Sequence, residues 1–334
     1  MAIRGHDQAA CCNTRRRLIA SASLLLLCPA VARAVDYPAR TVTIIVPFPP
    51  GGSTDLQGRL IASGLSERLG RPVIVENRAG AGGDVGSGIA ARAAADGYTL
   101  LLAGSTLVIE QVLGSNLGFD PERDLAPVAL IAEGPLILVA SPPLGVKNVS
   151  ELLTLARQHP GQLAYASFGS GSHSHLAGEL LKASAGVDLL HVPYKGGAPA
   201  LLAVMGGQVA AGIVTPLTAM ESIRAGKVSA LAVTGSRRLP SLPSVPTLAE
   251  SGVSGIELEM WSAIFVPAKT PRKIIARLSK EIVAVVQSSE VTRTIEDQGA
   301  FVVASGPDEV SGRVHSDFAS LSRQVKTINF KVVE

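Results

Sequence analysis

The chain alternates short apolar runs with longer segments in which apolar residues recur every three or four positions. The first clear run, Val42-Thr43-Ile44-Ile45-Val46, is rich in β-branched residues and predicts a buried strand at 42–46. A loop rich in proline and glycine follows at 47–52, and Ser53-Thr54-Asp55 offers N-cap chemistry for a helix. The apolar residues beyond it keep helical spacing: Leu56, Leu60, Ile61, Leu65 and Leu69. The pattern predicts a strand, a loop and a helix in that order.

The same alternation continues to the C-terminal part of the chain. Further strands are expected at 73–75, 98–102, 130–140, 163–166, 190–192, 209–214 and 229–233. Further helices are expected through Ile89 and Ala93 and at 149–158, 176–185, 199–205, 218–225 and 274–287. Apolar strands that alternate with helices predict an α/β fold whose sheets are covered on both faces. About 300 residues exceed a single compact core, so we expect two Rossmann-like lobes with mixed, mostly parallel sheets.

The N-terminus reads as a secretory signal peptide at 1–34. Arg15-Arg16-Arg17 precedes an apolar run that ends at Cys28, and Ala32-Arg33-Ala34 is an A-x-A cleavage site. The run is shorter than the ~20 residues of a membrane-spanning helix, and Pro29 ends it. Leu27 before Cys28 disfavours a lipid anchor, which normally needs a small residue there. The arginines also fit a twin-arginine signal, and both export routes stay open.

The leader accounts for the positive charge of the chain and for its cysteines. The full chain has 30 basic and 27 acidic residues, of which five basic residues and one acid fall in 1–34, so the remainder has a net charge of −1. Such a balance disfavours nucleic acid as a partner. All three cysteines, Cys11, Cys12 and Cys28, also lie in the leader. Disulfides, thiolate metal sites and cysteine nucleophiles are therefore not expected in the remainder.

Two loops that follow strands carry the strongest candidate chemistry. The first, 47–55, has Gly51 and Gly52 directly before a helix, where free backbone N–H groups and the helix dipole favour an anion. The second, 167–175, is dense in glycine, serine and histidine and also precedes a helix. In two-lobed α/β folds the ligand lies beyond the carboxyl ends of the strands. We therefore expect the two loops to hold a small anion from opposite sides.

Two shorter segments extend this interpretation. Gly104-Ser105-Thr106 follows the third strand, and Tyr194 or Lys195 follows the strand at 190–192. For the loop at 47–55, an ordinary strand-to-helix turn with an N-cap remains the alternative.

Enzyme signatures are weak. Gly169-Ser170-Gly171-Ser172 does not match the G-x-S-x-G nucleophile elbow. Gly86-Ser87-Gly88 with Ala91 resembles a dinucleotide fingerprint, but it does not follow a strand closely and lacks the acid expected downstream. His173 and His175 have no acidic or thiolate cluster near them in the sequence, so no metal site is expected. We expect no catalytic residues and no cofactor. An exported hydrolase or isomerase on the same scaffold is the alternative.

Several long motifs resemble the tripartite tricarboxylate transporter receptors, also called Bug-type solute-binding proteins. They include 46–55, Val75-Glu76-Asn77-Arg78 with its glycine-rich continuation, Asp96-Gly97-Tyr98-Thr99-Leu100, 169–180 and 191–196. Leu231-Ala232-Val233-Thr234 and the stretch 243–248 fit as well. The resemblance runs from about Tyr37 to the C-terminus. It implies a type II periplasmic-binding (Venus flytrap) fold, with lobe 1 at 35–138 plus 258–334 and lobe 2 at 139–257.

The resemblance also implies a monomeric periplasmic receptor that captures a small carboxylate. Its partners would be either the transporter's membrane subunits or a sensor kinase. The residues expected to contact the ligand lie in the loops described above and at two further strand ends: Phe48, Gly51, Gly52, Ser53, Asp55, Gly104, Ser105, Thr106, Ser167, Ser170, Ser172, His175, Tyr194 and Thr215. Asp55 is expected either to cap the first helix or to orient the ligand through water.

One position departs from the family pattern. Family members often carry a carboxylate after the strand that corresponds to Ala211-Gly212-Ile213-Val214, whereas this chain continues with Thr215 and Pro216. An acid there would bind an amino or hydroxyl group of the ligand. Its absence favours a plain carboxylate over an amino acid.

Overall fold

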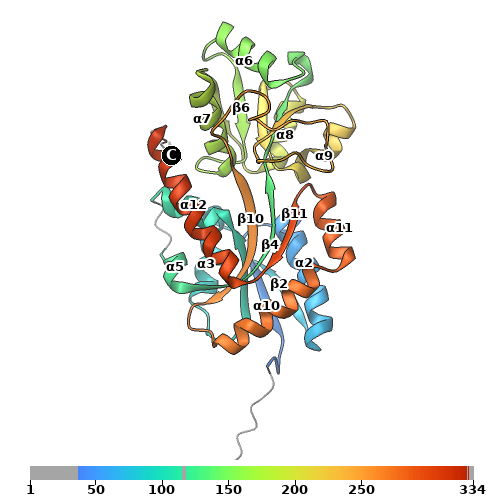
Figure 1. The fold of residues 1–334 in the computed structure, drawn as a ribbon, viewed down its shortest axis with the longest axis vertical. Coiled ribbons are helices and arrows are strands. Elements are labelled where there is room, and N and C mark those ends of the chain that lie inside the picture. The colour runs from blue at the N-terminus through green and yellow to red at the C-terminus, as the bar shows by residue number, and fades with distance from the viewer. Residues whose placement is uncertain (1–36, 115–117, 329, 331–334) are drawn as a thin grey trace, which may run out of the picture. The chain divides into compact units, whose positions relative to one another are not determined.

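The computed structural model describes residues 37–114, 118–328 and 330. The signal peptide expected at 1–34 lies outside the described residues. Within residues 38–334 the strands form two sheets, each flanked by helices (Figure 1). The first sheet has the strand order β11-β4-β10-β3-β1-β2, and the second has the order β7-β6-β8-β5-β9.

The first sheet combines the N-terminal strands with strands from the end of the chain. Its strands are β1 (Val42–Val46), β2 (Val73–Asn77), β3 (Thr99–Gly104), β4 (Leu125–Pro135), β10 (Glu259–Pro267) and β11 (Phe301–Ser305). β1 pairs in parallel with β2 and β3, whereas β10 runs antiparallel between β3 and β4. The helices are α2 (Ser53–Leu69), α3 (Asp84–Ala91), α4 (Ser105–Val112), α5 (Pro121–Asp124), α10 (Arg272–Val286), α11 (Ser289–Asp297) and α12 (Pro307–Thr327), with a 3₁₀ turn at Ala81–Gly83.

The second sheet is built from the middle of the chain. Its strands are β5 (Ile137–Ala140), β6 (Ala164–Ser167), β7 (Leu190–Pro193), β8 (Ala211–Val214) and β9 (Ser229–Val233). Its helices are α6 (Val149–Gln158), α7 (His173–Ala185), α8 (Gly197–Met205) and α9 (Pro216–Arg224), with a 3₁₀ turn at Pro142–Leu144. β5 runs antiparallel between β8 and β9, and β6 pairs in parallel with β7 and β8. Two mixed sheets covered by helices confirm the expected α/β class, but four of the nine strand pairings are parallel and five are antiparallel, so the sheets are not mostly parallel.

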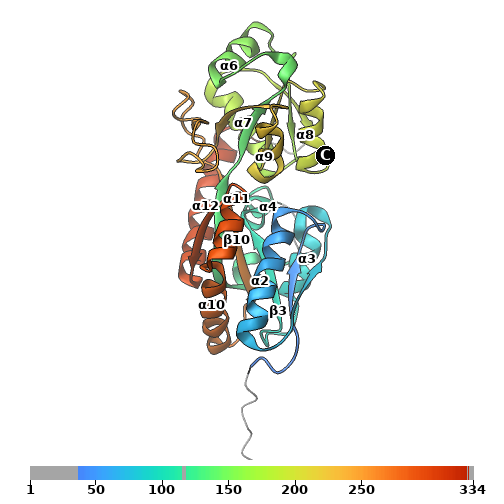
Figure 2. The same cartoon turned by 90° about the vertical axis from the view of Figure 1, so that its right-hand side faces the viewer.

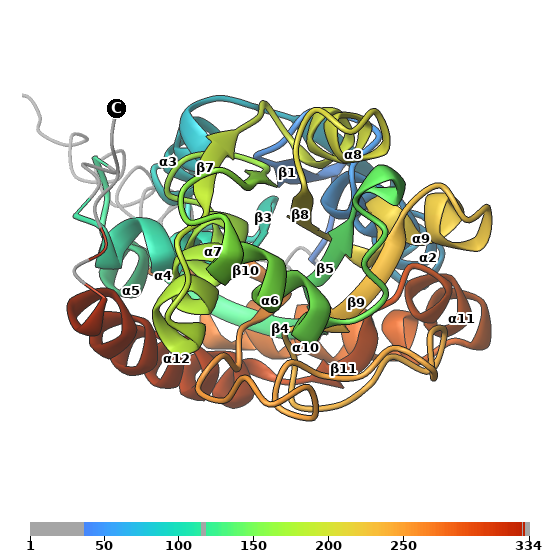
Figure 3. The ribbon, with the colours of Figure 1, turned by 90° about the horizontal axis from the view of Figure 1, so that it is seen from above.

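Side-chain alternation along the strands explains why helices cover both faces of each sheet. In β1, Ile45 belongs to a core cluster that includes residues of α3, α4 and α12. Its neighbour Val46 lies instead against α2, close to Gly58. In β6, Tyr165 packs with α6 and α7, whereas Ala166 packs with α8 and α9. Figure 2 shows α2 and α3 of the first sheet from the side, and Figure 3 shows α6 to α9 around the second sheet from above.

The chain passes between the two sheets where β4 continues into β5 and where β9 is followed by β10. The sequence predicted one extended segment at 130–140, but it divides at Leu136, whose peptide group bonds to neither sheet. The Leu136 N–H donates to Thr234 Oγ1 at 2.9 Å, and the Thr234 N–H donates to the Leu136 carbonyl at 2.9 Å. Thr234 Oγ1 also donates to the carbonyl of Leu258 at 2.6 Å. One buried threonine therefore ties the two connections together.

Candidate functional site

The first loop leaves β1 and is folded by Asp55, the third residue of α2. One carboxylate oxygen of Asp55 accepts the Gly51 N–H at 2.9 Å and Nε of Arg59 at 3.0 Å, and the other accepts Nδ2 of Asn77 at 2.9 Å. Nδ2 of Asn77 also donates to the Phe48 carbonyl at 3.1 Å. Asp55 is 4% exposed, whereas the side chain of its partner Arg59 is 54% exposed, so water reaches one side of the network. Asp55 organises the loop that precedes the helix but does not occupy the N-cap position.

The charge of Asp55 is balanced inside this network. Burial by itself raises the pKa of the carboxyl, but hydrogen bonds from Arg59, Gly51 and Asn77 lower it to about 2. Asp55 is therefore anionic at neutral pH, with Arg59 beside it. Because the pair is nearly neutral, its negative charge does not cancel the positive end of the α2 dipole.

Arg59 and Asn77 were not among the expected site residues. The signal for Asn77 was its place at the end of β2, because Asn77 pairs with Val46 at the end of the parallel neighbour β1. Carboxyl ends of neighbouring parallel strands meet at one edge of a sheet. The signal for Arg59 was its position four residues after Asp55 in a predicted helix, because residues spaced i, i+4 lie on the same helix face.

The α2 and α4 helices begin without a side-chain cap. Gly52 and Gly104 hold the two N-cap positions, and neither start has a capping hydrogen bond from a side chain. The first N–H groups of a helix have no partner within the helix. β1 and β3 are parallel neighbours, so both helix starts follow strand ends at the same edge of the first sheet. Gly104 is also required for space, because a Cβ there would overlap the carbonyl oxygen of Trp261.

Ser105 is the first residue of α4 and lies beside these free N–H groups. The side chain is buried, with 1% exposure of the residue, and its Oγ has no hydrogen-bond partner among the described residues. Thr106 follows it and is half-buried. A buried hydroxyl without a partner is uncommon in folded proteins and marks a place where a polar group can bind.

Two acidic side chains pack near the first loop. Burial, together with the neighbouring carboxyl of Asp84, raises the pKa of Glu110 to about 9, so Glu110 is protonated at neutral pH. Glu110 packs against Gly82, and a Cβ at the next residue, Gly83, would lie 3.4 Å from Cζ of Phe48. A neutral Glu110 reduces the negative charge close to the loop.

The second loop uses its hydroxyls to hold its own backbone. Ser172 caps α7: its Oγ accepts the His175 N–H at 3.2 Å and donates to the Gly169 carbonyl at 2.6 Å. Ser167, fully buried, accepts the Gly169 N–H at 3.2 Å. Ser170 is exposed. The start of α7 is thus capped, unlike the starts of α2 and α4.

Two stacked histidines, His175 and His191, contact the backbone and Ser167 of this loop. Nδ1 of His175 accepts the Gly171 N–H at 3.1 Å, and its ring stacks on that of His191 with centroids 3.6 Å apart. Nε2 of His191 lies 2.7 Å from Oγ of Ser167. Burial, followed by the charges of His191 and Lys182, lowers the pKa of His175 to about 3. His191 was not among the expected site residues, and it comes from β7, the parallel neighbour of β6.

Tyr194 and Thr215 lie at the same edge of the second sheet as Ser167. Tyr194 and Thr215 directly follow β7 and β8, and Ser167 is the last residue of their parallel neighbour β6. The Tyr194 N–H donates to the Ser167 carbonyl at 3.0 Å. Thr215 caps α9, and its Oγ1 lies 2.8 Å from Oγ1 of Thr218. The structure therefore gathers the expected residues into two groups, one at the edge of each sheet.

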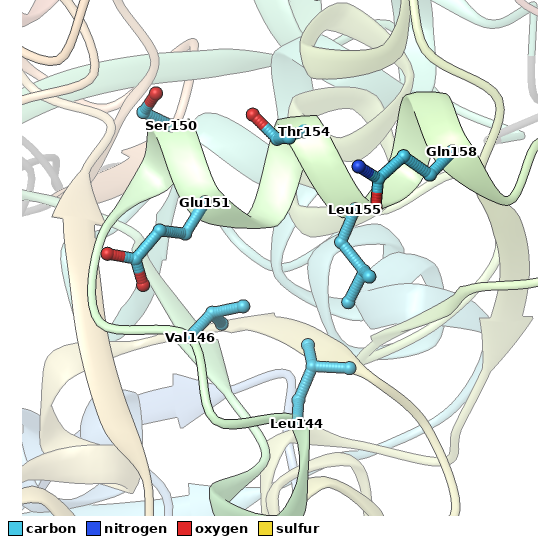
Figure 4. Close-up of a pocket in the computed structure, with 7 residues that line it drawn as sticks. All are labelled: Leu144, Val146, Ser150, Glu151, Thr154, Leu155 and Gln158. Atoms are coloured by element: carbon cyan, nitrogen blue, oxygen red, sulfur yellow. The ribbon is translucent and has the colours of Figure 1, made fainter.

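The arrangement offers little for enzymatic chemistry. Ser167 and His191 have the spacing of a nucleophile and its base, but the serine is fully buried and already bonded to Gly169. No cluster of three metal-ligating side chains occurs within the part of the chain that the structure describes. A surface hollow over α6, in a close-up in Figure 4, contains none of the expected site residues.

Comparisons with known proteins identify the family of the chain. The family profile described as "Tripartite tricarboxylate transporter family receptor" matches residues 58–329. The chain belongs to this receptor family. Among solved structures, the Rhodopseudomonas palustris protein Rpa4515 with adipate is 35% identical, with a TM-score of 0.82, and the match covers 88% of this chain and 99% of that one.

Two further structures extend the comparison. The periplasmic binding protein BugD is 33% identical, with a TM-score of 0.80 over 88% of this chain and 99% of its own. MatC from Rhodopseudomonas palustris with bound malate is 34% identical, with a TM-score of 0.78 over 86% and 100% of the two chains. The chain thus has the two-lobed type II fold of the Bug-type receptors, a family of solute-binding proteins rather than enzymes. Among the described residues, no helix has the length and apolar character that crossing a membrane requires.

Proposed function

We propose that this protein is a periplasmic receptor that binds a small organic carboxylate between its two lobes, 35–138 plus 258–334 and 139–257. The observation that carries the proposal is the pair of uncapped helix starts, α2 and α4, at one sheet edge beside the unpartnered hydroxyl of Ser105. Free N–H groups at helix starts bind carboxylates by charge-assisted hydrogen bonds. The adipate- and malate-bound relatives support the same ligand class.

In this proposal the two groups of loop residues have different tasks. The first loop and Gly104-Ser105-Thr106 bind the carboxylate through backbone N–H groups and hydroxyls. The second loop, with Ser170, Tyr194 and Thr215, closes over the rest of the ligand, while Ser167, Ser172 and His175 keep that loop in shape. The protein acts by binding and release, without catalysis. It delivers the ligand to membrane transporter subunits or to a sensor kinase, as a monomer.

The test is a thermal-shift and calorimetric titration with adipate, with its uncharged diamide as the matched control. We expect stabilisation by the acid and none by the diamide, because the helix starts recognise negative charge. Ser53→Asp then places a carboxylate at the start of α2. There it stabilises the helix of the ligand-free protein but repels an anionic ligand. Thr154→Asp, on exposed α6, adds the same charge far from the loops. Equal acid binding by both variants contradicts the site.

The ligand is expected to be a plain carboxylate. The strand β8 ends at Val214 with Thr215 after it, so no acid is placed there to bind an amino group. Glutarate and glutamate have the same carbon skeleton and differ by that group. If this protein binds five-carbon acids, glutarate binds more tightly; tighter binding of glutamate contradicts the inference.

Residues 1–34 are proposed as the leader, and the mass of the secreted protein tests cleavage after Ala34.

A further inference from the structure

The turn between α11 and β11, residues Gln298–Phe301, lies against the helices of the other lobe. α11 and β11 belong to the first sheet's lobe, whereas α9 belongs to the second sheet's lobe. Figures 1 and 2 both place α11 next to α9. At Gly299, a Cβ would lie 2.5 Å from Cβ of Pro216 and 3.5 Å from Cε of Met220. The two lobes therefore meet here at a distance that only a glycine allows.

The turn is held firmly on its own lobe. Gly299 ends α11 with φ +74°, and its N–H donates to the Glu296 carbonyl at 2.9 Å. A Cβ at Gly134 of β4 would lie 3.3 Å from the Gly299 carbonyl oxygen, so the turn also rests on that strand. Phe301 pairs with Glu133 of β4 in the sheet. The turn cannot move without moving the strand that leads into the second lobe.

The same turn carries side-chain contacts to the second lobe. The Phe301 ring packs against the core cluster of α8, α9 and the second sheet. The guanidinium of Arg237, from the loop after β9, lies 3.7 Å from the centre of that ring and pairs with Glu133 at 3.3 Å. Both amide atoms of Gln298, a residue 8% exposed, lack hydrogen-bond partners among the described residues. The contact thus includes an ion pair and a cation–π interaction, whereas the Gln298 amide adds no hydrogen bond to it.

α9, the helix that this turn touches, begins at a candidate ligand residue. Pro216 is its first residue and follows directly on Thr215, which caps the helix. Thr218, one turn further, packs on Gly197 at the start of α8, where a Cβ would lie 3.0 Å from Thr218 Oγ1. A displacement of Pro216 therefore moves the ends of two loops at the edge of the second sheet.

We propose that the turn Gln298–Phe301 is a spacer between the lobes, and that the contact of Gly299 with Pro216 sets the angle at which the two loop groups approach each other. Gly299 is then a positioning residue: it touches no ligand and acts through α9. Packed interfaces of this kind are not continuously deformable, so a change of one methyl group at the contact shifts the preferred angle.

The test measures the distance between the lobes without any ligand, so its outcome does not depend on the proposed function. Spin labels are attached in the full chain at Glu67→Cys on α2 and Gln158→Cys on α6, both exposed positions. Serine replaces Cys11, Cys12 and Cys28, which removes every native thiol. Double electron–electron resonance then gives the distribution of distances between the labels.

Gly299→Ala is expected to shift the mean distance, because the new methyl group needs roughly 1 Å more room at Pro216 to reach ordinary carbon contact. Gly252→Ala is the matched control: Gly252 also has positive φ, +85°, but nothing lies within 4 Å of its Cβ position. It carries the same backbone strain and should keep the wild-type distribution. Adding Pro216→Gly to Gly299→Ala should restore the wild-type mean by relieving the clash.

A folded Gly299→Ala variant with the wild-type distance distribution overturns the proposal. If Gly299→Ala does not fold, Pro216→Gly alone decides, with Pro121→Gly at the start of α5 as its control. Loss of the Pro216 ring is expected to broaden the distribution, and an unchanged distribution overturns the proposal in that case too.

Discussion

The imidazole rings of His175 and His191 stack with their centroids 3.6 Å apart and their planes within 8°. Two cations cannot share this geometry, so the stack requires at least one neutral ring. His175 is neutral because burial lowers its pKa to about 3 and because its Nδ1 accepts the Gly171 N–H. The stack therefore fixes both the protonation state of the pair and the shape of the second loop.

Acid should destabilise the protein through its buried histidines. Burial lowers the pKa of His173 to about 4, and that of His175 lies near 3, against 6.5 for an ordinary histidine. The unfolded chain then binds protons that the folded chain excludes, so stability is full above pH 6.5 and falls as the pH drops. The loss is on the order of 2 kcal/mol per histidine between pH 6.5 and 5.

Denaturant unfolding at pH 5, 6 and 7 measures this dependence. His173→Leu removes one of the buried bases and should flatten the acid limb, whereas His159→Gln, at an exposed position, should leave it unchanged. Parallel pH profiles for the wild type and His173→Leu contradict the assignment of His173 as a buried neutral base.

Asp55→Ala should weaken the first loop by about 2–4 kcal/mol. This is less than three full charge-assisted hydrogen bonds would contribute, because the Arg59 side chain is 54% exposed and water replaces part of what is lost. Asp55→Asn should cost less. Since the folded pKa is lowered to about 2, this stabilisation is present above pH 3.8 and disappears as the pH falls through 2. Glu221→Ala, which breaks an exposed ion pair with Arg224, is the control, with an expected effect within about 1 kcal/mol. Equal losses for the two variants contradict the role given to Asp55.

Gly178→Ala should destabilise the second lobe by about 1–3 kcal/mol, because the new methyl group overlaps the ring of Tyr165. That ring is buried, and its hydroxyl donates to Glu179 at 2.9 Å, so it has no room to move aside. Gly312→Ala in α12 meets nothing within 4 Å and should stabilise the helix by about 0.4–1 kcal/mol. Thermal unfolding of both variants gives the comparison, and the same sign of change in both refutes it.

Thr234→Val should loosen the connection between the lobes. It leaves the Leu136 N–H and the Leu258 carbonyl without the Thr234 hydroxyl, at a cost of about 2–4 kcal/mol, whereas Thr234→Ser keeps the hydroxyl. Trp261, the single tryptophan, lies in β10 and reports on the first sheet. Its fluorescence and far-ultraviolet circular dichroism should unfold together in the serine variant and at separate denaturant concentrations in the valine variant. Coincident transitions in both variants contradict this role for Thr234.

The alternation of apolar and helical segments predicted the elements that are buried on two sides. β1 and the middle strands of the second sheet have almost fully buried patterns, which the sequence displays as short apolar runs. β10 is an exception, because it is largely buried between β4 and β3 and was not predicted. β11 and α12 were not predicted either. β11 is an edge strand with a single buried residue, and among the described residues of α12 only Val310 and Leu321 are buried, so neither shows a clear apolar period.

The sequence also located the loops better than it assigned their side chains. The glycines and hydroxyls of 47–55 and 167–175 do lie at strand ends, as the motif order predicted. Yet Ser172 bonds within its own loop, and Ser167 pairs with His191, 24 residues away in another strand. Contacts of that kind depend on which strands become neighbours, and strand order is not contained in local spacing.

The place of β10 in the first sheet has a consequence for the order in which the protein can form. Gly104 of β3 pairs with Ser262 of β10, and all five strands of the second sheet lie between these two residues in the sequence. The first sheet therefore lacks its central strand until most of the chain has been made. Such distant pairing gives a high contact order and slow folding. An N-terminal fragment ending near β9 would contain all five strands of the second sheet but an open, aggregation-prone first sheet. The last quarter of the chain is thus what completes the first sheet, and the protein stays incompletely folded until that quarter is free to pair.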